Sequence, residues 1–409
     1  MHARLRGFGA RLSVIVAVGL AIRLVYALAL APDPAFLSDA NFFHLLANLV
    51  GDGRGFIHPF SFVTSGVTRP TAEHPPLYTL VLAVPSALGA TSYDAHRVVS
   101  CLLGTGTVGA VGYLGRRVGG ERVGLLAAGI AAIYPLLWVV DGSLMSESLY
   151  GLMIALTLIC AYRALDRPSA GSAALLGAVA GLAALTRGEA LLLVPLIVIP
   201  ATWRAGPRPV AAGLAAFVLV LVPWSVRNFV AFDRPVLVSN NTGSLLAGAN
   251  CSDTYGGRLI GGWSVACLSY PPNESEARVA ARLRRRGFDY IQGRTGRFLA
   301  VGGIRVLRTW DFFRVRQQIE LSGQEARDTR VERIGVIVYY PLLALAIWGA
   351  VLLRRRRETL LVLLAPAAMI TIMSFLGYGI TRFRMAVEIS IVVLAAVALV
   401  ALVERARAG

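Results

Sequence analysis

The chain has 409 residues, of which 56% are hydrophobic and only 15% are charged, and its mean hydropathy is +0.65. Soluble globular proteins carry about a quarter charged residues, so this composition excludes a soluble domain and indicates a membrane protein. The formal net charge is +17, and all 40 basic residues are arginine. Most of them lie in short segments between apolar runs, where retention on the cytoplasmic side explains them, so the charge does not predict a nucleic-acid partner.

Continuous apolar runs recur along the whole chain, each about as long as a helix that crosses a hydrocarbon core of ~30 Å. They predict an all-α polytopic membrane protein with about ten transmembrane helices. The first run follows a basic N-terminus like that of a signal peptide, but it is longer than a typical signal and contains Arg23, so we expect an uncleaved first span. The predicted spans are 12–31, 95–115, 122–140, 147–163, 171–186, 189–203, 210–225, 336–353, 359–376 and 385–403.

One further apolar piece, 76–90, decides the topology. It has 15 residues and is interrupted by Pro85. If it stays on the outer side as a juxtamembrane helix, both termini and most arginine clusters fall on the cytoplasmic side, as the positive-inside rule requires. The clusters are Arg4 to Arg11, Arg116 to Arg122, Arg163 and Arg167, Arg204 and Arg208, Arg354 to Arg357, and Arg405 and Arg407.

This topology divides the chain into a transmembrane module, 1–225, with a first outer loop, 32–94, then an extracytoplasmic loop region, 226–335, and C-terminal transmembrane helices, 336–409. The loop region contains Cys251 and Cys267, and the oxidising outer side favours a disulfide between them over two unpaired thiols.

The second half of that loop region, 278–316, is rich in arginine interleaved with aromatic residues. This pattern predicts amphipathic helices that lie on the bilayer surface and contact anionic headgroups.

Ionisable side chains gather at the outer edge of the predicted bundle, where each one needs a reason to be present. A carboxylate in a membrane-edge cavity can act as a general base or a metal ligand, and arginines beside it can hold a phosphate through paired hydrogen bonds. Helix capping, solvated loops and membrane-edge arginines are the plain alternatives. The candidates are Asp39, Glu73, His74, Asp141, Glu147, Arg382 and Arg384, whereas His44 fits better as a helix-face residue.

Six short segments in order form a recognisable layout: 38–40 (SDA), 72–78 (AEHPPLY), 144–150 (LMSESLY), 181–187 (GLAALTR), 222–228 (VPWSVRN) and 381–384 (TRFR). The layout resembles the GT-C class of glycosyltransferases that use polyprenyl-phosphate sugars. It is most similar to the family 39 branch with the protein O-mannosyltransferases, the aminoarabinose–lipid A transferase and the core galacturonosyltransferases.

The resemblance implies transfer of a sugar from a polyprenyl-phosphate donor to an acceptor hydroxyl, at the outer face of the cytoplasmic membrane. It makes Asp39 the base or metal contact and leaves open whether Asp141 or Glu147 is the second acid. The aminoarabinose transferase has Glu-Lys-Pro where this chain has Glu73-His74-Pro75, so its lysine's contact with the lipid phosphate would fall to His74. Arg382 and Arg384 would complete the phosphate site. A divalent metal is the one cofactor left open, and neither the sugar nor the acceptor (protein, lipid or polysaccharide) follows from the sequence.

Two other classes of function compete with this reading. A transporter or flippase for lipid-linked or anionic molecules would need polar groups along a path through the membrane, often within duplicated halves. The candidate residues here gather at one face instead. A non-catalytic scaffold for envelope assembly would not depend on any acid.

Overall fold

The computed structural model describes residues 2–271, 274–356 and 358–408. Within these residues the regular secondary structure is entirely helical, which confirms the predicted all-α membrane fold. Seven helical segments are long and apolar enough to cross a membrane. They are α1 (His2–Val25, continued by Tyr26–Leu30), α5 (Tyr93–Gly119), α8 (Glu147–Asp166), the segment from Gly188 to Ala205, α11 (Pro207–Phe232), α16 (Thr329–Arg355) and α18 (Met385–Ala408).

The helices α6 (Glu121–Ile133) and α7 (Pro135–Gly142), which meet at an angle of 46°, are together long and apolar enough for an eighth span. Pro135 explains this break, because proline cannot donate the helical hydrogen bond and its ring crowds the preceding turn. Two shorter apolar helices, α9 (Ala170–Ala184) and α17 (Leu361–Leu376), correspond to the other two predicted spans.

The helix α4 (Pro76–Ala87) is the apolar piece on which the predicted topology depended. Its 12 residues rise only about 18 Å, well short of a ~30 Å hydrocarbon core. It packs against α2 (Asp39–Gly51). Its length and its packing on another helix of the first loop agree with the predicted juxtamembrane position.

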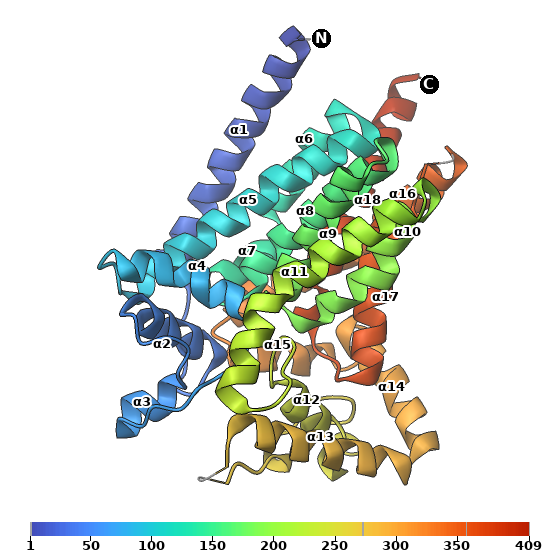
Figure 1. Cartoon of the computed structure of the whole chain (residues 1–409). Coiled ribbons are helices and arrows are strands. Elements are labelled where there is room, and N and C mark those ends of the chain that lie inside the picture. The colour runs from blue at the N-terminus through green and yellow to red at the C-terminus, as the bar shows by residue number, and fades with distance from the viewer. Residues whose placement is uncertain (1, 272–273, 357, 409) are drawn as a thin grey trace.

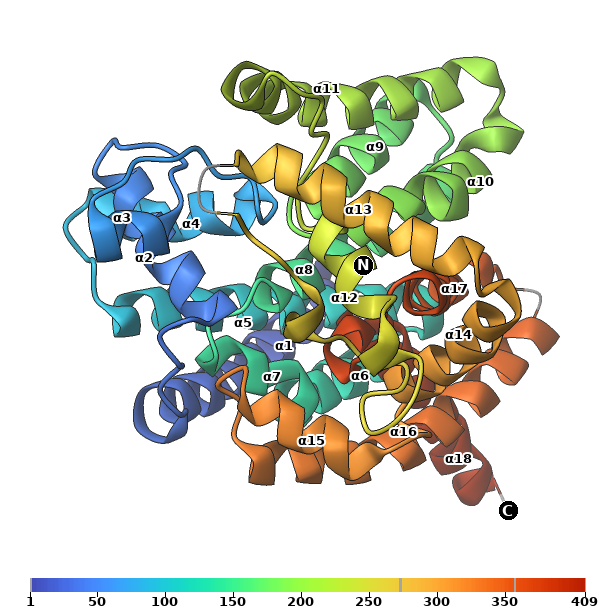
Figure 2. The same ribbon diagram turned by 90° about the horizontal axis from the view of Figure 1, so that it is seen from below.

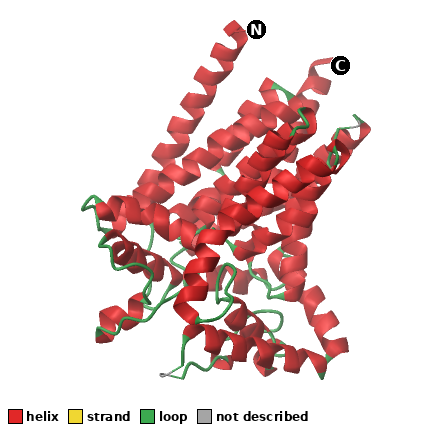
Figure 3. Ribbon diagram, in the orientation of Figure 1, coloured by secondary structure: helices red, strands yellow, loops and turns green. Residues whose placement is uncertain are grey.

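Both described ends of the chain lie at the same end of the helix bundle (Figure 1). The helices of the two long loops cover the opposite end, where Figure 2 views them face-on and Figure 3 shows most of the long loops. We call this the loop end. Besides α2 it includes α3 (Pro59–Ser65), α12 (Thr242–Ala249), α13 (Glu276–Gln292), α14 (Thr295–Thr309) and α15 (Val315–Gly323).

The helix α18 is at the centre of the core, and its residues from Met385 to Ala398 are buried almost without interruption. It packs against α5, α6, α8, α16 and α17. Glycine allows the closest of these approaches: a Cβ on Gly349 of α16 would lie 2.0 Å from the carbonyl oxygen of Leu394. Small residues at such crossings are the usual means of helix packing in membranes, where there is no hydrophobic force between helices.

The basic helix α13 does not lie on a bilayer with its apolar face, and the prediction for this helix is wrong. Its apolar residues Ala277, Val279, Ala280 and Leu283 are buried, and the helix packs closely on α12. Its arginines are exposed on the other side. In α14, by contrast, Leu299 and Leu307 remain exposed.

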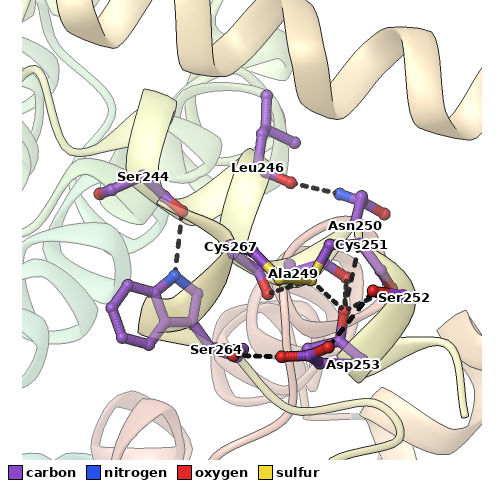
Figure 4. The surroundings of a disulfide bond; sticks show 12 residues. Ser244, Leu246, Ala249, Asn250, Cys251, Ser252, Asp253, Ser264 and Cys267 are labelled. Carbon is purple, nitrogen blue, oxygen red and sulfur yellow. Dashed lines mark hydrogen bonds between the residues drawn. A yellow bond between two sulfur atoms is a disulfide. The ribbon is translucent and has the colours of Figure 1, made fainter. Parts of the chain in front are cut away.

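A disulfide joins Cys251 and Cys267, the pair predicted from the sequence (Figure 4). It closes a loop beside α12, and side-chain hydrogen bonds stabilise this loop further. The Ser264 hydroxyl donates to Asp253 at 2.9 Å, and the Trp263 ring N–H donates to the Ser244 carbonyl at 2.9 Å. The other two cysteines, Cys101 and Cys160, are buried and unpaired.

Reduction of this disulfide is expected to destabilise the loop region by about 3 kcal/mol, the chain-entropy value for a closed loop of this size. The measurement is the thermal unfolding midpoint with and without reductant, with a Cys251→Ser/Cys267→Ser double variant as the reference that reductant leaves unchanged. Alkylation of the denatured chain without reductant should label only Cys101 and Cys160. Labelling of all four cysteines would contradict the prediction.

Candidate active site

A cavity of about 1190 Å³ opens at the loop end of the bundle. Its walls come from segments that are far apart in the sequence: 35–43, 73–75, 186–192, 234–245 and 373–383. Additional residues come from the loop region, including Glu325 and Arg284. The cavity therefore exists only because the first loop, the long loop region and the segment between α17 and α18 fold over one another.

Arg382 is the residue at which these segments meet. It lies just before α18, and its side chain is 11% exposed. One of its terminal nitrogens, Nη1, lies 3.1 Å from Asp39 and 2.9 Å from Glu325, while Nε lies 3.7 Å from Glu147. Three carboxylates from three separate segments thus surround a single guanidinium group.

Asp39 is placed by the start of α2. Ser38 caps that helix by accepting a hydrogen bond from the Asn41 N–H, and Asp39 follows in the first turn, where the helix dipole favours a negative charge. Its side chain is 38% exposed, the most open of the carboxylates around Arg382. Burial raises the pKa of Asp39, but His74 and Arg382 lower it by more, so the net pKa is below the ordinary value. Asp39 is therefore a charged carboxylate facing the cavity at neutral pH.

Glu147 and Arg187 form a second ion pair directly behind Arg382. The Glu147 side chain is wholly buried at the start of α8, and it lies 2.7 Å from Arg187. Arg187 also lies 2.5 Å from Glu189 and stacks over the ring of Phe383, 5.5 Å from its centroid. Arg187 lines the cavity, although the sequence analysis gave it no role beyond membership of a matching segment.

Asp141, the alternative to Glu147 as second acid, lies elsewhere. It is completely buried against Arg23 of α1, at 3.0 Å. Arg23 also donates hydrogen bonds to the carbonyl groups of Gly19, Ala131 and Ala132. This pair sits within the helix bundle and does not line the cavity, so the structure brings Glu147, and not Asp141, next to Asp39.

Arg384 is also separated from the cavity. It pairs with Asp311 at 2.8 Å and with Glu388 one turn along α18, and its guanidinium lies 3.6 Å from the Tyr339 ring centroid. Its side chain is buried. Of the two arginines predicted to hold a phosphate, only Arg382 lines the cavity.

Glu73 and His74 both line the cavity. The His74 ring packs against Phe42 and Phe43 of α2, and its Nε2 lies 3.7 Å from Asp39. Glu73 points away from this pair and lies 3.5 Å from His58. His44 instead contacts His96, with their Nδ1 atoms 3.0 Å apart.

Glu276, a residue that the sequence analysis did not single out, holds the backbone just before Glu73. Its carboxylate accepts hydrogen bonds from the Thr71 hydroxyl at 2.6 Å, the Ala72 N–H at 2.9 Å and the Asn240 amide at 2.8 Å. Arg227 of α11 binds the same segment by donating a hydrogen bond to the Thr71 carbonyl at 2.8 Å. Burial and the neighbouring Glu73 raise the pKa of Glu276 by more than the hydrogen bonds from these uncharged donors lower it.

The described part of the chain contains no group of three or more His, Cys, Asp or Glu side chains arranged to hold a metal ion. The carboxylates beside the cavity are engaged with Arg382 and Arg187 instead. These residues do not form a ligand set as they stand, so no catalytic step is derived through a metal.

The separation of Asp141 from the cavity leads to a test. Replacing either Arg23 or Asp141 with Leu leaves a buried charge without its partner, which is expected to destabilise the protein by about 3–5 kcal/mol. The Arg23→Leu/Asp141→Leu double variant removes both charges and should recover most of that loss. Thermal unfolding in detergent measures all three. Equal stability of the single and double variants would contradict a pairing role for Asp141.

Comparisons with known proteins agree with the layout seen in the sequence. The family model "Dolichyl-phosphate-mannose-protein mannosyltransferase" matches residues 73–226. No curated protein sequence matches the chain.

Among solved structures, the oligosaccharyltransferase AglB from Archaeoglobus fulgidus, in complex with an inhibitory peptide and a dolichol-phosphate, superposes with a TM-score of 0.58 at 16% identity. That match covers 98% of this chain and 51% of AglB. The apo form of the Archaeoglobus fulgidus oligosaccharyltransferase gives a TM-score of 0.54 at 17% identity, over 97% of this chain and 51% of that one.

ArnT from Cupriavidus metallidurans, bound to undecaprenyl phosphate, is more distant, with a TM-score of 0.43 at 17% identity over 95% of this chain and 77% of ArnT. The chain spans about half the length of the oligosaccharyltransferases that it matches. At these identities the likeness concerns the fold. It confirms the resemblance predicted from the sequence: the chain is a multi-pass membrane protein with a GT-C-like fold.

Proposed function

We propose that this chain is an integral-membrane glycosyltransferase that moves a sugar from a polyprenyl-phosphate donor to an acceptor hydroxyl at the outer face of the cytoplasmic membrane. The observation that carries the proposal is the meeting of Asp39 and Arg382, 3.1 Å apart, in a cavity at the loop end of a GT-C-like bundle. An ionised carboxylate and a guanidinium are the two groups that this reaction needs side by side.

The reaction assigns one task to each charge. Asp39 accepts the proton of the acceptor hydroxyl, whose oxygen attacks the anomeric carbon of the sugar. The bond between that carbon and the phosphate oxygen breaks, and its electron pair stays on the phosphate. Arg382 stabilises this departing charge, with His74 as the second donor on that side. Attack opposite the leaving group inverts the configuration at the anomeric carbon.

The lining of the cavity also suits a lipid-linked donor. Leu191 and Leu192 form one apolar wall, and Met373 and Leu376 of α17 form another. These residues belong to membrane-spanning or membrane-embedded segments, so a polyprenyl chain could pass from the cavity to the bilayer along them. The polar walls are contributed by the loops, where a hydrophilic acceptor would enter.

The outer-face location is supported by the disulfide. Cys251 and Cys267 lie in the loop region that covers the same end as the cavity, and a disulfide persists in an oxidising compartment. Because both described chain ends lie at the other end of the bundle, the termini would be cytoplasmic.

Asp39→Asn keeps the size of the side chain but removes the proton acceptor, so sugar transfer from a polyprenyl-phosphate sugar should fall at least 100-fold. The assay follows transfer in liposomes that contain the purified protein and a bacterial membrane extract as acceptor source. The matched control is Asp33→Asn in the same loop, because the Asp33 side chain is 94% exposed and outside the cavity. Unchanged transfer by Asp39→Asn would remove Asp39 from the mechanism, and movement of the lipid-linked sugar across the bilayer without transfer would favour a transporter.

Arg382→Lys keeps the positive charge but loses the planar fork that binds a phosphate through two hydrogen bonds. Binding of undecaprenyl phosphate should weaken about 10-fold. Titration in nanodiscs followed by native mass spectrometry measures the affinity directly, without any need for the acceptor. An unchanged affinity would mean that the phosphate binds elsewhere.

A further inference from the structure

Glu325 is a cavity residue that neither the sequence layout nor the proposed reaction uses. It lies in the turn between α15 and α16 and reaches across the cavity to Arg382, with its Oε1 2.9 Å from Nη1. This is shorter than the distance from the same nitrogen to Asp39. The Glu325 side chain is 19% exposed and lines the cavity.

We infer that Glu325 occupies the place at Arg382 that the lipid phosphate takes, and that its carboxylate competes with that phosphate and so sets the affinity of the site. This inference rests on the proposed function, because it assumes that Arg382 binds the phosphate. It assigns Glu325 a role in controlling ligand affinity, with no part in the bond changes themselves.

The charges around Arg382 support competition. Asp39, Glu147 and Glu325 all lie within 3.7 Å of its guanidinium. Its Nη1 already faces Asp39 and Glu325, and its Nε faces Glu147, so a phosphate oxygen that approaches this guanidinium meets carboxylate oxygens that repel it. An incoming phosphate must therefore displace one of them.

Glu325 is the carboxylate that can leave. Asp39 is fixed at the start of α2, and Glu147 is wholly buried and paired with Arg187 at 2.7 Å. Glu325 belongs to no helix, and the next residue, Ala326, has a φ of 58°. A residue with a side chain adopts this left-handed conformation at a cost of about 1 kcal/mol, so the turn is held by its contacts and not by backbone preference.

A second arginine, Arg327, lies close enough to Glu325 to pair with its carboxylate after displacement from Arg382. Arg327 is buried and its Nη1 lies 3.7 Å from Glu332. Its other terminal nitrogen, Nη2, lies 3.8 Å from the second Glu325 oxygen, Oε2, which accepts no hydrogen bond from the described residues. Burial raises the pKa of Glu325 despite the opposing effect of Arg382 and Arg327, so its charge is costly where it stands. A small rotation toward Arg327 would exchange one cation for another.

Competition has a consequence for turnover. The donor is a phosphate diester with one negative charge, whereas the released polyprenyl phosphate is a monoester with a charge of about −1.5 to −2 at neutral pH. The product therefore binds an arginine more strongly than the donor does. Return of Glu325 to Arg382 would drive the product out and reset the cavity.

Glu325→Gln removes the competing charge with little change in shape. We expect it to bind undecaprenyl phosphate about 10-fold more tightly than the wild type in the nanodisc titration. In the transfer assay the same variant should show a lower KM for the donor together with a lower kcat, because product release slows. A residue that only supported the structure would not produce this split.

The matched control is Glu320→Gln, which removes the same charge from α15 at a side chain that is 66% exposed and outside the cavity. It should leave the affinity unchanged. Glu325→Asp provides a second variant in case the Gln variant is unstable. Its shorter side chain cannot keep the 2.9 Å contact, so it should also bind the phosphate several-fold more tightly than the wild type.

The outcomes separate the two proposals. If the folded wild-type protein binds no undecaprenyl phosphate, the proposed function fails. If the wild type binds it and the Glu325 variants bind it equally or more weakly, the competition is wrong while the proposed function stands. If Glu320→Gln tightens binding as much as Glu325→Gln, the effect is a general one of net charge and the inference is also overturned.

Discussion

The guanidinium of Arg382 is the constraint on which the loop end of this protein depends. Through Asp39, Glu147 and Glu325 it connects the first loop, the start of α8 and the turn before α16 to the start of α18. Partly buried charges of this kind are strongly destabilising when left alone and acceptable only when each has its partners. These ion pairs therefore hold the walls of the cavity together.

A second set of contacts holds the Glu73-His74 segment of the cavity wall in place. Glu276 and Arg227 hold the backbone at Thr71, directly before the Glu73-His74 pair, with hydrogen bonds from α13 and α11. Because Glu276 is the first residue of α13, its hydrogen bonds connect this arginine-rich helix to the Glu73-His74 segment. The apolar face of α13 packs on α12, which makes this helix part of the folded loop region.

The sequence was sufficient for the properties that depend on local pattern. Hydrophobic run length gave the membrane spans, and the outer location of the loop region predicted the Cys251–Cys267 pair. The ordered segments placed Asp39 and Arg382 at the same end of the bundle.

The sequence could not decide whether Asp141 or Glu147 is the second acid. The two residues are six positions apart, at a bend between two helices, so both lie at a similar depth in the predicted bundle. Arg23 of α1 pairs with Asp141 and keeps it away from the cavity. This pairing depends on how α1 packs in three dimensions, which the sequence does not reveal. Glu325 lies in an irregular turn with no motif around it, so only the three-dimensional structure brings it to the cavity.

Solvent access distinguishes the roles of Arg23, Arg384 and Arg382. Arg23 and Arg384 are each 1% exposed, and both are enclosed by acids and by backbone carbonyl groups within the bundle. A ligand cannot reach either one without unfolding the helices around it, so their charges serve the packing of α1 and α18. Arg382 has the same kind of partners but is 11% exposed and lines the cavity. Of its three carboxylate partners, Glu325 lies outside the helices, in a turn next to a second arginine. A buried charge can become a binding site only when one of its partners can be replaced at low cost, and of these three arginines Arg382 is the one for which we propose this.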